Sequence, residues 1–183
     1  MSRTTHFAIG SALALLVISA SAKAAVVESN AQGFAIEEKA QIAASPDKVY
    51  AVLIHPENWW SSQHTFSQDA KNLSLDAKAG GCLCETLPGG GSVQHLVVAT
   101  AMPGKTLLLR GAMGPFQSQG VDGALIFTLT QKDGGTELTL DNNVGGYIKG
   151  GMGKWPMAAD AMLTDLVARL KYYAENGKAM PAK

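Results

Sequence analysis

The sequence predicts an α+β fold in which a curved antiparallel β-sheet wraps around a long C-terminal α-helix, with two short helices after the first strand. Three observations lead to this prediction. They are a capped helix start at Ser45-Pro46, a series of short β-segments between residues 72 and 144, and an apolar helical stripe that begins at Trp155. A sheet and a helix that are each apolar on one face bury those faces by packing against each other.

The first predicted elements are a strand and a capped helix. Residues 34–42 have the composition of a strand, and residues 25–32 before them are expected to be a linker. Ser45 offers a side-chain oxygen for the N-cap of the helix, and Pro46 suits the first helical position. We expect this helix to end just before Pro56, because the residue that precedes a proline is pushed out of the α region.

Short β-segments separated by turn residues fill the middle of the chain. The expected strands are residues 72–76, 81–87, 92–100, 105–110, 124–131 and 136–144. Short connections join antiparallel neighbours, so these strands are predicted to form a meander. The Gly89-Gly90-Gly91 run lies between two strands and is not followed by Lys-Ser/Thr, which indicates a hairpin turn and not a phosphate-binding loop.

The last predicted element is an amphipathic helix of about 20 residues, roughly 30 Å long. Its apolar residues recur at steps of three or four, and Asn176-Gly177 is a natural C-terminal stop. The stripe consists of Trp155, Ala159, Met162, Leu166, Leu170 and Tyr173. A helix of this length matches the width of a small sheet.

Residues 1–24 have the order of a secretory signal peptide: Arg3, an apolar run from Phe7 to Ala20, and then small residues. The apolar run is shorter than the roughly 20 residues of a membrane-spanning helix. Alanines occupy the positions required for cleavage after Ala22 or after Ala24. We therefore expect a periplasmic or secreted protein with no stable membrane insertion after cleavage; an uncleaved N-terminal anchor is the alternative.

The charge pattern argues against a nucleic-acid-binding surface. The full chain has 15 basic and 15 acidic residues, and the loss of Arg3 and Lys23 with the signal peptide would leave 13 basic residues and a net charge of −2. Such a balance gives no basic stripe for nucleic acid or anionic lipid. A chain of this size usually forms one domain and buries about 70% of its unfolded surface, enough for a core that contains a cavity.

The two cysteines, Cys82 and Cys84, are expected to be buried, reduced thiols. On a flat strand, residues i and i+2 lie about 6.5 to 7 Å apart at Cα, at the limit for a disulfide. A redox pair and a metal site shared with His95 are the alternatives. No compact Cys or His spacing of a zinc site is present, so neither a metal nor a cofactor is predicted.

The order of these elements resembles the START-like superfamily, the SRPBCC or polyketide cyclase-like proteins with the helix-grip fold, over about residues 33–175. The resemblance is carried by residues 43–50, Gly80-Gly81, residues 102–105, residues 125–129 and the terminal helix. It implies a hydrophobic cavity between sheet and helix, in a family that binds lipids, sterols, polyketides or plant hormones and includes some cyclases and dehydratases. The expected domains are a signal peptide at 1–24, a START-like ligand-binding domain at 33–177 and a flexible tail at 178–183.

Three residues are candidates for catalysis: His64, Glu85 and His95. A neutral imidazole with a pKa near 6.5 is suited to proton transfer, and Glu85 can act as its partner or as a base. In the expected hairpin Cys84 lies opposite His95 and Glu85 opposite Gln94, whereas a slip of one residue would reverse the faces. The simpler alternative is that both histidines satisfy local hydrogen bonds.

Aromatic and loop residues complete the candidate ligand site. Adjacent Trp59 and Trp60 diverge by about 100° on a helical turn, so that one can enter the core while the other covers the cavity mouth. Arg110 either neutralises a ligand carboxylate or reaches solvent, and two glycine-rich loops either gate the cavity or are ordinary connections. The expected ligand-binding residues are Trp59, Trp60, His64, Glu85, His95, Arg110, Met113, Phe116, Tyr147 and Trp155.

Three functions are compatible with the sequence. The first is an exported monomer or weak homodimer that binds a small hydrophobic ligand. The second is an enzyme of the cyclase or dehydratase type that uses His/Glu acid–base chemistry, which requires at least two candidate groups to meet at one pocket. The third is a partner-binding module like the chaperone co-activators of the superfamily, against which the signal peptide argues. No catalytic signature decides whether the protein is an enzyme.

Overall fold

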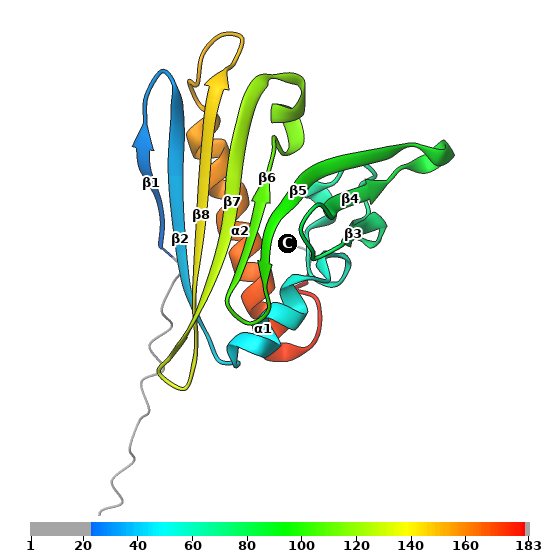
Figure 1. The fold of residues 1–183 in the computed structure, drawn as a ribbon, viewed down its shortest axis with the longest axis vertical. Coiled ribbons are helices and arrows are strands. Elements are labelled where there is room, and N and C mark those ends of the chain that lie inside the picture. Colours follow the sequence, from blue (N-terminus) through cyan, green and yellow to red (C-terminus); the bar gives the residue numbers. More distant parts are fainter. Residues whose placement is uncertain (1–22, 182–183) are drawn as a thin grey trace, which may run out of the picture.

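The computed structural model of the protein describes residues 23–181, so most of the expected signal peptide lies outside the described residues. An antiparallel eight-stranded sheet curves around the C-terminal helix (Figure 1), with the strand order β1-β2-β8-β7-β6-β5-β4-β3. The predicted fold class is therefore confirmed. Within residues 23–181, no helix is both long enough and apolar enough to cross a membrane.

The helices are α1 (Pro46–Leu53) and α2 (Trp155–Asn176). The strands are β1 (Lys23–Ser29), β2 (Gly33–Ile42), β3 (Leu73–Leu75), β4 (Cys82–Thr86), β5 (Ser92–Met102), β6 (Thr106–Arg110), β7 (Gly120–Lys132) and β8 (Gly135–Tyr147). Short 3₁₀ turns connect them: η1 (Pro56–Asn58), η2 (Ser62–His64), η3 (Ala70–Asn72), η4 (Pro88–Gly90) and η5 (Gly114–Ser118).

The two helices begin and end where their capping residues predict. The Ser45 side chain accepts a hydrogen bond from the Lys48 amide at 3.4 Å, and α1 stops before Pro56. Gly177 ends α2 in the left-handed conformation with a φ of 67°, which glycine adopts without strain. The buried stripe of α2 packs into the concave face of the sheet and contains Ala159, Leu163, Leu166, Val167, Leu170 and Ala174.

Residues 25–32 are not the linker that the sequence suggested, because most of them belong to β1. This strand forms the edge of the sheet and pairs with β2, with Val26 opposite Ile36. Val26 and Val27 favour extended backbone, but both stay exposed at the edge. The alternation of buried and exposed residues that marks an inner strand is therefore weak here.

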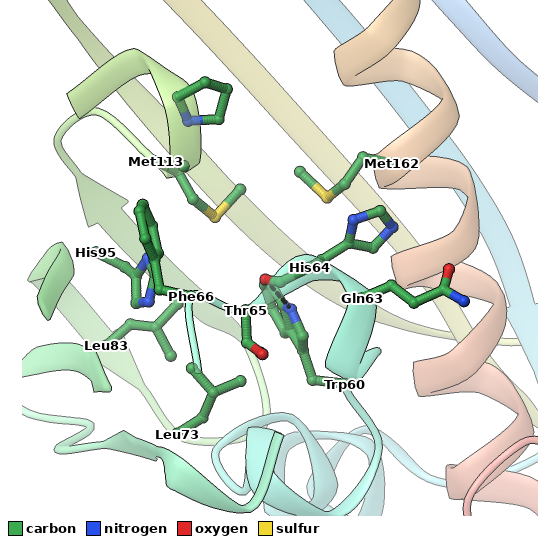
Figure 2. A pocket seen from close by; sticks show the side chains of 12 residues that line it. Trp60, Gln63, His64, Thr65, Phe66, Leu73, Leu83, His95, Met113 and Met162 are labelled. Carbon is green, nitrogen blue, oxygen red and sulfur yellow. Dashed lines mark hydrogen bonds between the residues drawn. The ribbon is translucent and has the colours of Figure 1, made fainter. Parts of the chain in front are cut away.

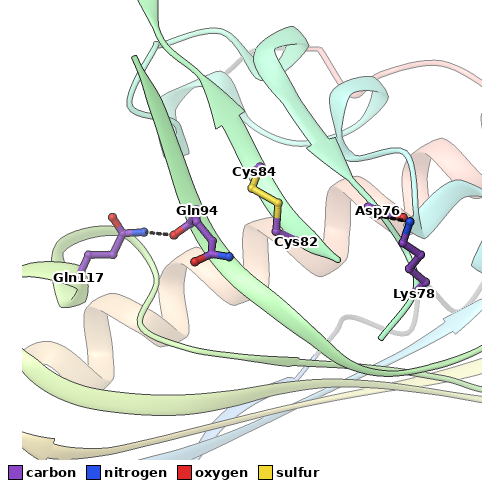
Figure 3. Close-up of a disulfide and its surroundings, with 6 residues drawn as sticks. All are labelled: Asp76, Lys78, Cys82, Cys84, Gln94 and Gln117. Atoms are coloured by element: carbon purple, nitrogen blue, oxygen red, sulfur yellow. Dashed lines mark hydrogen bonds and ion pairs between the residues drawn. A yellow bond between two sulfur atoms is a disulfide. The ribbon is translucent and has the colours of Figure 1, made fainter. Parts of the chain in front are cut away.

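The two cysteines form a disulfide, so the expectation of reduced thiols was wrong (Figure 3). Their Cα atoms lie 5.4 Å apart, within the usual range for a bridge. The expectation assumed a flat strand, whereas the register of β4 against β5 shifts between Leu83 and Cys84. Both cysteines are half-buried, and they alternate along β4 with the buried Leu83 and Glu85.

Removal of this disulfide is expected to cost little stability. The bridge closes a loop of only three residues, so Cys82→Ser/Cys84→Ser should lower the free energy of unfolding by about 1.6 kcal/mol. Urea unfolding of the double variant and of the reduced wild type measures the loss. A loss above about 4 kcal/mol would contradict a purely local role for the bridge.

One fully buried carboxyl group lies between β2 and α2. Glu38 Oε1 accepts a hydrogen bond from the Thr164 hydroxyl at 2.8 Å, while within the described part of the chain Glu38 Oε2 and the buried Asp160 Oδ1 have no partner. Burial raises the pKa of Glu38 above its ordinary 4.5, the Thr164 bond opposes this rise, and the negative charge of Asp160 adds to it. The folded protein therefore holds this proton more tightly than the unfolded chain does.

Glu38→Gln is expected to raise the free energy of unfolding at pH 7 by about 1 to 2 kcal/mol. A buried carboxyl group at this pH must either be ionised in the core or take up a proton, whereas a neutral amide has neither cost. The pKa of Glu38 is higher in the folded protein than in the unfolded chain. Its contribution to stability is therefore fully present below pH 4.5 and is lost as the pH rises through the folded pKa. Urea unfolding at pH 4 and pH 7 compares the variant with Glu37→Gln, a half-exposed control on the same strand. An equal pH dependence of stability for wild type and Glu38→Gln would contradict the raised pKa of Glu38.

Candidate functional site

A cavity of about 370 Å³ lies between α2, the β4–β5 part of the sheet, and two loops (Figure 2). Its wall is mainly apolar, formed by Trp60, Phe66, Leu73, Leu83, Met113, Pro115 and Met162. The other lining residues are Gln63, His64, Thr65, His95 and Gly114. The set contains no Lys, Arg, Asp or Glu, so the two histidines are the titratable groups of the wall.

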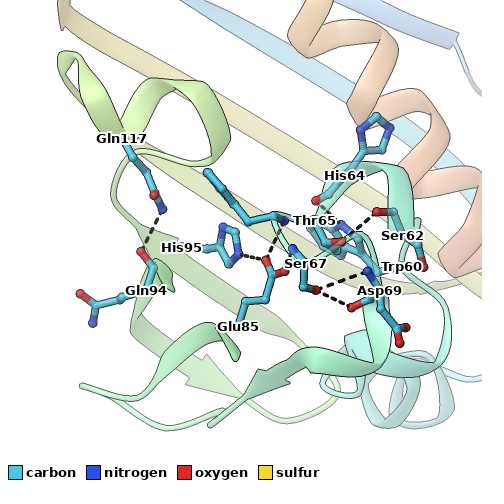
Figure 4. A network of polar contacts seen from close by, with 11 residues as sticks. Trp60, Ser62, His64, Thr65, Ser67, Asp69, Glu85, Gln94, His95 and Gln117 are labelled. Atoms are coloured by element: carbon cyan, nitrogen blue, oxygen red, sulfur yellow. Dashed lines mark hydrogen bonds and ion pairs between the residues drawn. The ribbon is translucent and has the colours of Figure 1, made fainter. Parts of the chain in front are cut away.

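Glu85 on β4 connects the cavity wall to the loop beside it (Figure 4). Its side chain is almost fully buried, and Oε2 accepts hydrogen bonds from His95 Nε2 at 2.8 Å and from the Phe66 amide at 3.1 Å. Oε1 accepts a hydrogen bond from the Ser67 amide at 2.5 Å. One carboxyl group thus connects β4, β5 and the loop that carries His64 and Phe66.

The hydrogen bonds of Glu85 also determine its charge. Burial raises its pKa, but the bonds from Ser67, Phe66 and His95 act in the opposite direction and together hold the pKa below the ordinary 4.5. A carboxylate that accepts several hydrogen bonds is stabilised in its ionised form. Glu85 is therefore an anion at neutral pH.

His95 reaches the cavity because of a β-bulge in β5. Leu83 pairs with Leu96 and Cys84 pairs with Gln94, which leaves His95 as the extra residue. His95 and Leu96 are consecutive yet both buried, an arrangement that regular strand alternation does not give. The expected pairings were therefore wrong: Cys84 lies opposite Gln94, not His95, and Glu85 lies opposite Val93.

His64 lies on the helix side of the cavity, across from His95 (Figure 2). Its Nε2 is 3.9 Å from Asp165 Oδ2 on α2, and the same oxygen accepts a hydrogen bond from Arg169 Nε at 2.6 Å. The Trp60 indole N–H donates to the His64 carbonyl at 3.3 Å. Two of the three catalytic candidates thus line one cavity, and the third, Glu85, is bonded to one of them.

The adjacent tryptophans diverge as expected. Trp59 is buried in the core, and its indole N–H donates to the Val52 carbonyl at 2.9 Å. Trp60 lines the cavity, and the two ring centroids are 5.3 Å apart. Trp59 therefore supports the wall from behind without forming part of it.

The other predicted ligand residues fall into two groups. Met113 lines the cavity, whereas Phe116 and Trp155 do not; their rings are tilted against each other with centroids 5.1 Å apart. Phe116 borders a smaller space of about 40 Å³ that shares Met113 and Met162 with the main cavity. Arg110 and Tyr147 do not line the cavity: Arg110 is exposed and pairs with Asp122, and Tyr147 is 71% exposed at the end of β8.

Several lining residues had not been identified from the sequence, and Phe66 is the most informative. Its side chain is 52% exposed, its ring lies 5.7 Å from the His95 ring, and its amide donates to Glu85. A phenylalanine between polar residues in a loop was a signal that could have been used. The others are Gln63, Thr65, Leu73, Leu83, Gly114, Pro115 and Met162. In residues 23–181 no group of three or more His, Cys, Asp or Glu is arranged to hold a metal ion.

Comparison with known proteins identifies the fold. No protein-family model matches the chain, and no curated protein matches it. Solved structures do match. The conserved protein of unknown function EF2215 from Enterococcus faecalis has a TM-score of 0.59 and 15% identity, over 88% of this chain and 81% of that chain.

Two further solved structures are similar over most of this chain. CalU16 from Micromonospora echinospora has a TM-score of 0.56 and 15% identity, over 87% of this chain and 86% of its own. DynU16, a protein in the dynemicin biosynthetic locus, has a TM-score of 0.57 and 23% identity, over 79% of this chain and 48% of its own. At these identities the likeness shows the fold, a helix-grip arrangement, and nothing finer.

Proposed function

We propose that the protein binds a small, mainly apolar ligand in the cavity between α2 and the sheet. The observation that carries this proposal is a cavity of about 370 Å³ with an apolar wall and two imidazoles on opposite sides. Ligand sites typically occupy about 300 to 1,000 Å³ and combine apolar walls with a few placed polar groups. The likeness to DynU16, which belongs to the dynemicin biosynthetic locus, supports the same class of function.

The proposal is tested by native mass spectrometry and thermal unfolding. Purified, delipidated protein is mixed with a panel of neutral aromatic compounds, isoprenoids and fatty acids. We expect a one-to-one complex and a raised melting temperature for at least one neutral compound. The absence of any complex and of any stabilisation across the panel would contradict the binding function.

Export is part of the proposal. Cleavage after Ala22 would leave β1 whole, whereas cleavage after Ala24 would remove its first two residues. We therefore propose cleavage after Ala22, and the intact mass of protein from the exported fraction tests it. The same spectrum separates a monomer from a weak homodimer.

A second candidate function is proton transfer on a bound carbonyl compound. The Glu85–His95 hydrogen bond of 2.8 Å favours it, because a carboxylate that is bonded to the imidazole orients the ring for proton transfer. Exchange of α-hydrogens of a bound ketone for deuterium in D₂O, followed by NMR, tests this function. Binding of the ketone with no exchange above that in buffer would reject catalysis and leave binding intact.

A further inference from the structure

We infer that the ligand is uncharged and that its polar group is a hydrogen-bond donor, an O–H or N–H, which His95 Nδ1 accepts. This inference rests on the proposed binding function and specifies the class of ligand. It follows from three features of the site: the donors that surround Glu85, the free nitrogen of His95, and the absence of charged side chains from the cavity wall.

The proton on the His95 ring is placed by Glu85. An ionised carboxylate only accepts hydrogen bonds, and Glu85 already accepts two from the backbone amides of Phe66 and Ser67. The contact of 2.8 Å between Glu85 Oε2 and His95 Nε2 is a hydrogen bond only if Nε2 carries the proton. In the neutral imidazole Nδ1 is then an acceptor with a free lone pair.

This acceptor has no protein partner in the described part of the chain. The Nε2 atom makes the one hydrogen bond recorded for the ring. Nδ1 is also not enclosed by protein, because the buried side-chain atoms without a partner belong to Glu38, Tyr50 and Asp160. His95 borders this cavity and also an open space beside Arg110, and the proposal places the Nδ1 lone pair on the cavity side.

The rest of the wall selects against ligand charge. No lining residue is a Lys, Arg, Asp or Glu, so an anionic or a cationic ligand in the cavity would lose its hydration without gaining an ion pair. The wall instead offers the rings of Trp60 and Phe66 and the thioethers of Met113 and Met162, which make favourable contacts with aromatic faces and edges. A neutral aromatic alcohol fits this combination.

Three two-ring probes test the inference by isothermal titration calorimetry. 2-Naphthol carries the donor, 2-methoxynaphthalene blocks it with a methyl group, and naphthalene lacks the oxygen. One hydrogen bond is worth up to about 1.4 kcal/mol, so 2-naphthol should bind roughly tenfold more tightly than its methyl ether. In His95→Phe, which keeps an aromatic ring but removes the acceptor, this ratio should fall to about one.

The outcomes separate the two proposals. Equal affinity of wild type for 2-naphthol and its ether overturns the inference and leaves the binding function in place. Failure of all three probes to bind also overturns the inference, whereas the binding function is contradicted only if the isoprenoids and fatty acids of the wider panel fail as well. Nitrogen-15 NMR of histidine-labelled wild type provides a test that needs no variant. It should show the Nε2–H tautomer for His95 under the conditions of the calorimetry, and an Nδ1–H tautomer or a ring protonated on both nitrogens would overturn the inference.

Discussion

Glu85→Ala is expected to lower the free energy of unfolding by about 3 to 5 kcal/mol, the usual cost of removing one partner from a buried ionic network. The substitution leaves the amides of Phe66 and Ser67 and the His95 Nε2–H without their acceptor. The loop that carries His64 and Phe66 then loses its attachment to β4. Urea unfolding measures the loss, and hydrogen exchange of the Phe66 and Ser67 amides reports the release of the loop.

The same prediction has a defined pH dependence. The pKa of Glu85 is lower in the folded protein than in the unfolded chain. Its contribution to stability is therefore fully present above pH 4.5 and is lost as the pH falls through the folded pKa. The stability difference between wild type and Glu85→Ala should therefore shrink in acid. Thr86→Ala, at the exposed next position of β4, is the control. A difference below about 1 kcal/mol at pH 7, or one independent of pH, would contradict the network described for Glu85.

Met162→Trp is expected to weaken ligand binding by at least about 100-fold, close to 3 kcal/mol, because the indole fills space that the ligand needs. Met162 is half-buried on the cavity side of α2 and also borders the smaller space near Phe116. Calorimetry with 2-naphthol measures the loss.

The control for this variant lies on the same helix. Met157 is 75% exposed, so Met157→Trp adds the same side chain outside the cavity and should leave the affinity unchanged. Thermal unfolding of both variants verifies that they are folded. Wild-type affinity in a folded Met162→Trp would place the ligand outside this cavity.

Local chemistry made much of the fold predictable. The Ser45 cap, Pro56 and Gly177 act within a few residues of where they stand, and they set the ends of α1 and α2. The apolar stripe of α2 and the glycine-rich turns between strands are equally local signals. The edge strand β1 was missed because Val26 and Val27 are both exposed at the edge of the sheet. The strand therefore lacks the alternation of buried apolar and exposed polar residues that predicts an inner strand.

The candidate site was predictable in its residue types but not in its geometry. His64, Glu85 and His95 could be selected because polar, titratable groups among apolar residues need partners. The contact between Glu85 and His95 depends on the bulge in β5, which arises from pairing between strands and leaves no mark in the sequence of either. The disulfide was missed for the same reason, since the spacing of Cys82 and Cys84 was judged from a flat strand.

The most direct test of the proposed binding site is an NMR titration of methionine-methyl-labelled protein with 2-naphthol. The chain has seven methionines, of which Met113 and Met162 line the cavity while Met102 and Met157 are exposed. Binding in the cavity predicts shifted methyl signals for Met113 and Met162, with nuclear Overhauser contacts to the naphthol ring. Contacts to the methyl groups of Met102 or Met157 alone, with unchanged signals for Met113 and Met162, would contradict it.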